Sequence, residues 1–279
     1  RDIFQNWEAL ATAFPAFLPA MVARFVNAST VDGFNPYRIS REGIDWEVPE
    51  PDDPWSNIGY WGDHQVIYLL KLLESLHQHD PDALGAMLGD AVFSYADVPY
   101  TLKPYAEILD DPAATIVYDE ERAARIAGRE AARGTDGRLV AGDDGEVLHV
   151  TLLEKLLVPA LAKLSNLVPG GGIWMNTQRP EWNDANNALA RGGVSVVTLA
   201  YLRRYLAFLA DRLEAVDPTP APVSLAVVAW FERVAATYAA TPPDLDGPDA
   251  DRRRKEVMDT LGEAFGDYRA AAYAHGPGG

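Results

Sequence analysis

The stretch WMNTQRPEWNDANN, residues 174–187, stands apart from the rest of the chain in its composition. It follows a glycine run at residues 170–172 and precedes a long apolar pattern with helical spacing. Tryptophan faces stack on pyranose rings, amides and arginine bind hydroxyl groups, and a carboxyl group performs acid–base chemistry. The composition therefore predicts a sugar site. A second interpretation is a polar helix start capped by Asn183 or Asp184, and the two are compatible because a capping residue can also face a cleft.

Apolar residues recur at helical spacing on both sides of this stretch, over residues 3–26, 63–76, 147–167, 194–213, 224–238 and 251–273. Residues 81–95 predict a shorter helix, and residues 118–133 an exposed, charge-rich one. Pro15 and Pro19 interrupt the first pattern, which predicts two helical pieces or a kinked one. We expect about eight or nine helices, little strand and a single all-α domain over residues 1–279.

The composition excludes several classes of function. The chain has 279 residues, 48% of them hydrophobic, and a formal net charge of -17. Such a charge argues against a nucleic-acid partner, which needs a basic face. The absence of cysteine excludes disulfides, thiolate zinc sites and a cysteine nucleophile, and we expect no metal and no cofactor.

No signal peptide and no run of about 20 apolar residues is found in the sequence. We therefore expect no membrane partner and a cytoplasmic protein, and the missing initiator methionine predicts a piece of a longer chain.

Tryptophan is concentrated between the predicted helices rather than within them. Five of the seven tryptophans lie in three interhelical stretches, which favours a binding cleft over a core: Trp46, Trp55, Trp61, Trp174 and Trp182. Residues 32–55 form a long loop whose aromatic residues indicate that it is ordered.

Titratable residues in the loops have simple structural interpretations. Asp63 is predicted to cap a helix, with His64 partly exposed beside it, and His77 and His79 are predicted to be solvated. The acidic residues of the long loop predict a solvated turn, although one of them could serve as a base: Asp45, Glu47, Asp52 and Asp53. No nucleophile elbow, P-loop lysine motif or dinucleotide fingerprint is present in the sequence.

Three short motifs together resemble a known family. They are Arg1-Asp2 followed by Gln5, the Asp63 segment that opens a helix, and Trp182-Asn183-Asp184. In this order they resemble the catalytic domain of cellobiose-phosphorylase-type enzymes, among the six-hairpin (α/α)6-barrel glycosidases. The resemblance covers roughly residues 1–215 and departs from the family pattern at Glu181 and Ala185.

The resemblance implies an (α/α)6-toroid of helical hairpins, incomplete in this chain because fewer than twelve helices are predicted. It implies that Asp184 is the general acid, that Trp182 helps to form a sugar subsite, and that Arg1 and Asp2 bind sugar hydroxyls. The family's phosphate-binding His and Ser/Thr segments have no placed counterpart. The residues expected to bind substrate are Arg1, Asp2, Trp61, Asp63, His64, Trp174, Gln178, Arg179, Trp182 and Asn183.

We therefore expect cleavage of a glycosidic bond in an oligosaccharide or disaccharide, by an inverting hydrolase or a phosphorylase that uses inorganic phosphate. Hydrolysis requires a second carboxylate about 6.5–9.5 Å from the acid. Its candidates are Asp45, Glu47, Asp53 and Asp63. Trp174 and Trp182 could raise the pKa of Asp184 by providing an apolar wall.

Two alternatives remain open at this point. One is a non-catalytic carbohydrate-binding or interaction module on an α-toroid scaffold. The other is a purely structural helical domain, in which the loop tryptophans would be buried against their own helices.

Overall fold

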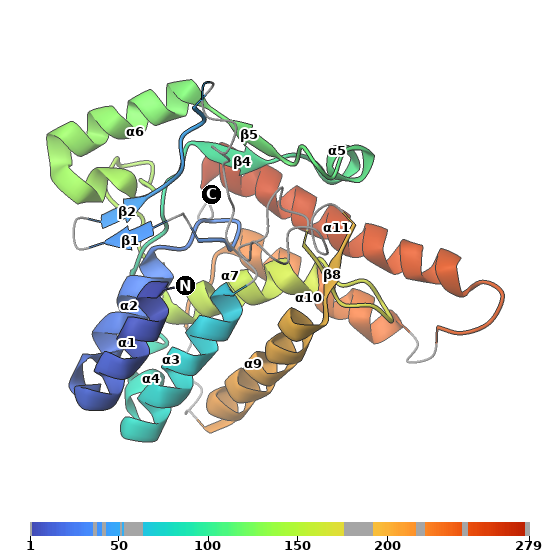
Figure 1. Cartoon of the computed structure of the whole chain (residues 1–279), viewed down its shortest axis with the longest axis horizontal. Helices are drawn as coiled ribbons and strands as arrows, with labels where there is room; N and C mark the ends of the chain where they lie inside the picture. Colours follow the sequence, from blue (N-terminus) through green and yellow to red (C-terminus); the bar gives the residue numbers. More distant parts are fainter. Residues whose placement is uncertain are drawn as a thin grey trace.

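The computed structural model describes residues 2–35, 38–40, 43–50, 52, 64–175, 192–215, 221–241 and 245–276, and it is mostly helical, in keeping with the predicted all-α class (Figure 1). The helices of the described residues are α1 (Asp2–Ala13), α2 (Leu18–Asn27), α3 (Gln65–His79), α4 (Ala83–Met87), α5 (Tyr105–Asp110), α6 (Glu120–Arg133), α7 (Leu152–Leu164), α9 (Val196–Ala215), α10 (Leu225–Ala240) and α11 (Ala250–His275). Two 3-10 turns, η1 (Pro15–Phe17) and η2 (Gly134–Arg138), join α1 to α2 and follow α6.

Short strands connect these helices in four antiparallel pairs among the described residues. The pairs are β1 (Arg38–Ser40) with β2 (Gly43–Asp45), β3 (Ala91–Phe93) with β6 (Val150–Thr151), β4 (Tyr100–Leu102) with β5 (Ile116–Tyr118), and β7 (Ile173–Trp174) with β8 (Val194–Ser195). The helix predicted over residues 81–95 is wrong in its second half. There α4 ends and β3 pairs with β6, a long-range pairing that local periodicity does not report.

The first helical pattern is split at its prolines, as predicted. Pro15 begins the η1 turn, and the chain bends by 119° between Asn6–Ala13 and Pro15–Asn27. No single helix of the described chain is long and apolar enough to cross a membrane; this bent pair meets the length and composition test only when its two parts are taken together.

Helices α1, α3 and α9 lie side by side and begin at the same end of the molecule (Figure 1). The pairing of α3 with α9 is parallel, because the Arg204 guanidinium contacts the Glu74 carboxylate at 2.7 and 2.8 Å and, two turns further on, Arg212 Nη1 lies 2.6 Å from His77 Nε2. The prediction that His77 is solvated is therefore wrong, whereas His79 is exposed as predicted. Further down α1, Glu8 pairs with Lys71 of α3 at 3.1 Å.

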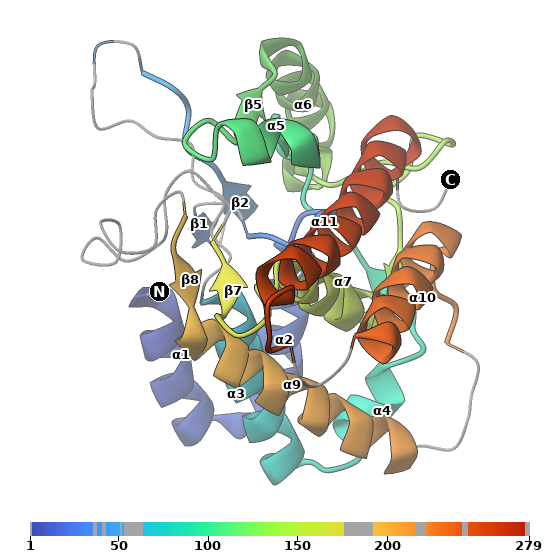
Figure 2. The ribbon, with the colours of Figure 1, turned by 90° about the vertical axis from the view of Figure 1, so that its right-hand side faces the viewer.

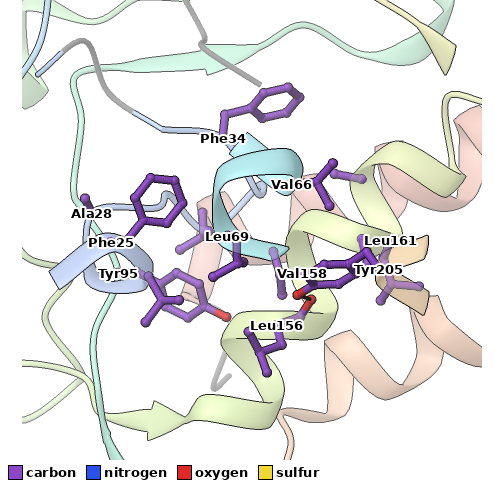
Figure 3. Packing of buried hydrophobic residues seen from close by; sticks show 14 of the residues in the cluster. Phe25, Ala28, Phe34, Val66, Leu69, Tyr95, Leu156, Val158, Leu161 and Tyr205 are labelled. Carbon is purple, nitrogen blue, oxygen red and sulfur yellow. Dashed lines mark hydrogen bonds between the residues drawn. The ribbon is translucent and has the colours of Figure 1, made fainter. Parts of the chain in front are cut away.

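The centre of the core is α7, which contacts α2, α3, α9 and α10. Leu156, Val158 and Leu161 of α7 are buried and pack with Val66 of α3 and Tyr205 of α9 (Figure 3). Thr151 caps the helix by accepting a hydrogen bond from Glu154 N at 3.3 Å. Helices that are apolar on all sides are typical of such central positions, which explains the strong apolar pattern seen in this part of the sequence.

Helix α10 packs against α7, and α11 packs against α10 (Figure 2). Trp230 of α10 stacks on Phe265 and Tyr268 of α11, with ring centroids 4.8 and 4.3 Å apart, and donates a hydrogen bond from Nε1 to Ser165 Oγ at 3.0 Å. This tryptophan is a core residue.

Candidate functional site

Most of the residues predicted to bind or cleave a sugar lie outside the described residues: Arg1, Trp61, Asp63, Gln178, Arg179, Trp182, Asn183 and Asp184. Asp2 begins α1, but its side chain is likewise outside the description. The structure describes two of the predicted site side chains, His64 and Trp174, together with the elements that flank the remaining ones. The candidate site is therefore built from these flanking elements.

The end at which α1, α3 and α9 begin is also where the predicted site segments join the scaffold (Figure 1). The Asp63 segment leads directly into α3, and residues 176–191 connect β7 to β8, which runs straight into α9. The fold therefore anchors three motifs far apart in the sequence to one end of three parallel helices.

The start of α3 is a buried polar position. His64 is 7% exposed and stacks on Tyr68, with ring centroids 5.5 Å apart, so the prediction of a partly exposed histidine is wrong. His64 precedes the first residue of α3 but makes no capping hydrogen bond through its side chain. One reason for the burial of His64 is that the ring of Tyr68, four residues and one turn further along the helix, packs on it.

Gln65 joins the start of α3 to the segment after α2. Its Nε2 donates to Asn35 Oδ1 at 2.7 Å, and both side chains are buried. The other amide atom, Gln65 Oε1, is buried and has no hydrogen-bond partner among the described residues. Buried unsatisfied acceptors are uncommon because each costs about 1–3 kcal/mol, so this oxygen is suited to accept from a hydroxyl or a water. Sequence reasoning missed Gln65 because it sits inside an apolar helical pattern.

The strand pair β7–β8 holds the two ends of residues 176–191 together. Ile173 pairs with Ser195 and Trp174 with Val194, and Met175 N donates to Gly193 O at 3.3 Å. The glycine run makes this possible. A Cβ on Gly172 would lie 2.8 Å from Ser195 O, and Gly170 adopts a φ of +78°, which an L side chain rarely tolerates.

Trp174 lies within this pair and is buried, as part of the hydrophobic core. Its backbone N donates to Asn166 O at 2.8 Å. Burial is the result expected of a structural tryptophan, and Trp46, which is partly buried beside the Arg138 guanidinium at 5.3 Å, is likewise covered. Trp55 lies outside the described residues. The two described loop tryptophans thus pack against the scaffold.

The acidic loop is only in part the solvated turn predicted for it. Strands β1 and β2 pair with each other, and Asp45 of β2 accepts hydrogen bonds from Arg38 and from Arg138 Nη1, the latter at 3.1 Å. The bond from Arg38 is the largest influence on Asp45 and, with that from Arg138, holds the pKa of this carboxyl below its usual value. A carboxylate held ionised by two guanidinium groups is a weak base. Asp52 is exposed, Glu47 is partly buried, and Asp53 lies outside the described residues.

Three further carboxylates are buried, and sequence reasoning missed them. Asp97 pairs with Arg122 and Arg129 of α6, and the other two are bound by hydroxyl and backbone donors. Glu154 of α7 accepts from Tyr95 OH at 2.9 Å and from Ser224 N and Oγ at 2.7 Å each. Asp32 accepts from Thr30 Oγ1 and Tyr273 OH. Glu154 and Asp32 are each surrounded by donors, so these two groups fix the packing of α7, α10 and α11 rather than offering a free base.

No group of three or more His, Cys, Asp or Glu side chains that could hold a metal ion is found in the part of the chain that the structure describes. A comparison with models of known protein families and with curated proteins finds no match to this chain.

Proposed function

We propose that the chain is part of a carbohydrate-active enzyme that cleaves a glycosidic bond, with Asp184 as the general acid. The observation that supports it best is the convergence of the motif segments: residues 1–2, 63–65 and 176–191 all join the scaffold where α1, α3 and α9 begin. Such convergence of loops at one end of a helical scaffold is the usual arrangement of a binding site.

The proposed scaffold is an incomplete (α/α)6-toroid of helical hairpins. Parallel α1, α3 and α9 would belong to the inner ring, and α2, which returns antiparallel to α1, to the outer ring. The proposed substrate is an oligosaccharide or disaccharide, bound by the residues named from the sequence.

Of the candidates for the second carboxylate, Asp45 is the one disfavoured by its partners, and Glu47, Asp53 and Asp63 stay candidates within this proposal. Hydrolysis needs a second carboxylate that is free to activate water. Asp32, Asp45 and Glu154 are all occupied by hydrogen-bond donors. Attack by inorganic phosphate needs no such base, because phosphate is itself the nucleophile.

The test is a screen of disaccharides with and without phosphate, comparing the unchanged protein with Asp184→Asn. We expect release of a free sugar or, with phosphate as the nucleophile, of a sugar phosphate, reduced by at least about 100-fold in the variant because general-acid catalysis contributes that much. Asp211→Asn, at an exposed position of α9, is the matched control and should retain full activity. Equal turnover by Asp184→Asn and the control would contradict the assignment of the acid.

The alternative is a non-catalytic carbohydrate-binding module on the same scaffold. It is favoured by the same occupied carboxylates. The burial of Trp174 instead favours the purely structural helical domain. Sugar binding measured by calorimetry, without turnover on any disaccharide with or without phosphate, would select it.

A further inference from the structure

The first of two exposed apolar surfaces is a groove between α1 and α2, which we call the α1–α2 groove. It encloses about 390 Å³ and is lined mainly by apolar side chains, among them Trp7, Leu10, Phe14, Phe17 and Met21. The bend at Pro15 leaves Phe14 and Phe17 exposed at 56% and 59%. Arg24 is the charged residue in the lining, and its guanidinium also donates to Ser40 O.

The second surface is the outer side of α10, which we call the α10 face. The inner side of this helix buries Val227, Trp230 and Val234 against α7 and α11. Within α10, all of which the structure describes, Glu232 is the one charged residue among the exposed positions Leu225, Val228, Ala229, Phe231, Glu232, Ala235, Ala236, Ala239 and Ala240. Its large side chains form a ridge at the start of the helix, where Leu225 is 81% exposed.

Both surfaces present apolar side chains to solvent. Soluble monomers rarely expose contiguous apolar patches beyond a few hundred Å², and larger patches mark interaction sites. A row of alanines also lets another helix approach closely, because interaxial distance depends on the side chains at the contact. Each surface therefore has the properties of a helix-packing surface that lacks its partner.

The two surfaces lie on opposite sides of the molecule. In both views α1 and α2 are at one side and α10 is at the other (Figures 1 and 2). A single copy cannot bring them together. If they meet, they do so between copies, in a head-to-tail contact rather than a two-fold one.

We propose that the α10 face of one copy docks into the α1–α2 groove of a second copy. The surfaces match in polarity, since the exposed side chains of Leu225, Val228 and Phe231 would meet an open apolar groove. The charges are complementary as well, since Glu232 is the charge on the ridge and Arg24 the charge in the groove. This pairing matters in a chain of net charge -17, where most other surfaces of two copies repel each other.

The proposal is tested by sedimentation velocity on the unchanged protein and two variants, over a range of concentrations. Phe14→Glu places a carboxylate in the groove, and Phe231→Glu places one on the ridge. We expect the unchanged protein to show a mass that rises with concentration and each variant alone to remain a monomer.

An equimolar mixture of the two variants distinguishes the proposed contact from a two-fold contact. Phe14→Glu keeps its α10 face and Phe231→Glu keeps its groove, so one intact contact can form between them. We expect a one-to-one heterodimer that grows no further. A monomeric unchanged protein at every concentration, assembly of either variant alone, or a mixture that stays monomeric would each overturn the proposal.

Circular dichroism identifies any variant that fails to fold, and Phe17→Glu and Leu225→Glu then replace the original pair.

Exchange of the two charges, Arg24 and Glu232, provides a second measurement. Arg24→Glu and Glu232→Arg should each weaken association by about two- to five-fold, as is usual for one ion pair, and the double variant should recover most of the loss. Glu214→Arg, exposed on α9, changes the net charge equally and serves as the control. Equal effects of Glu232→Arg and Glu214→Arg would contradict the pairing.

Discussion

Helices α7 and α10 lie against each other, yet they place their polar and apolar residues in opposite ways. The interior helix α7 buries Glu154, Lys155 and Lys163, whereas α10 exposes Leu225, Val228 and Phe231. Both carboxylate oxygens of Glu154 accept hydrogen bonds. Lys155 Nζ donates to Ser29 O at 3.2 Å and lies 3.5 Å from the centroid of the Tyr95 ring. The comparison shows that available partners, rather than residue polarity alone, decide what is buried.

The two sides of α10 should differ most in their effect on stability. Trp230→Ala removes a ring stacked between Phe265 and Tyr268 and should lower the free energy of unfolding by about 3–5 kcal/mol. Phe231→Ala, at the neighbouring but half-exposed position, should cost about 1 kcal/mol. Urea unfolding of dilute protein measures both values. Similar losses would mean that the outer side of α10 is packed within a single copy.

Buried and exposed glutamates on the two helices should also differ. Glu154→Ala leaves Tyr95 OH and the two donors of Ser224 without their acceptor, and the expected loss is about 3 kcal/mol. Glu232→Ala on the outer side of α10 should change the free energy of unfolding by less than about 0.5 kcal/mol. The same urea titrations test this pair, and a small loss for Glu154→Ala would show that water satisfies these donors.

The smallest expected effect concerns pH and Lys155. Burial lowers the pKa of this amine well below its usual value, so the unfolded chain binds more protons over the interval between the two pKa values. Stability should therefore rise with pH across that interval, and Lys155→Met should remove this part of the dependence. Compared at increasing pH up to about 10, the stability of the variant relative to the unchanged protein should fall steadily. A constant difference would mean that the amine keeps its proton in the folded state.

The main helices could be predicted from the sequence because their apolar spacing is local information. The patterns over 224–238 and 251–273 correspond to α10 and α11, and the exposed helix over 118–133 corresponds to α6, in which Ile126 is the buried residue. The strands could not be predicted, because two- and three-residue strands carry too short a pattern and pair with distant partners such as Val150 with Phe93.

Part of the candidate site could also be predicted. The glycine run marked this segment in the sequence, and the close approach of Gly172 to Ser195 explains why glycine is required there. The burial of His64 and the arginine pairing of Asp45 could not be predicted, because they depend on Tyr68 and on Arg138, the latter far away in the sequence. The roles of Asp184 and Trp182 remain predictions.

The β7–β8 pair has a consequence for how this protein can change. The β7–β8 pairing holds residues 175 and 193 together. The contacts of this pairing therefore offset the entropy cost of closing the chain between these two residues. Each doubling of the length of such a connection costs only about 0.6 kcal/mol more. The strand pair thus allows insertions, deletions and new side chains between residues 175 and 193 to be selected while the flanking helices keep their sequence.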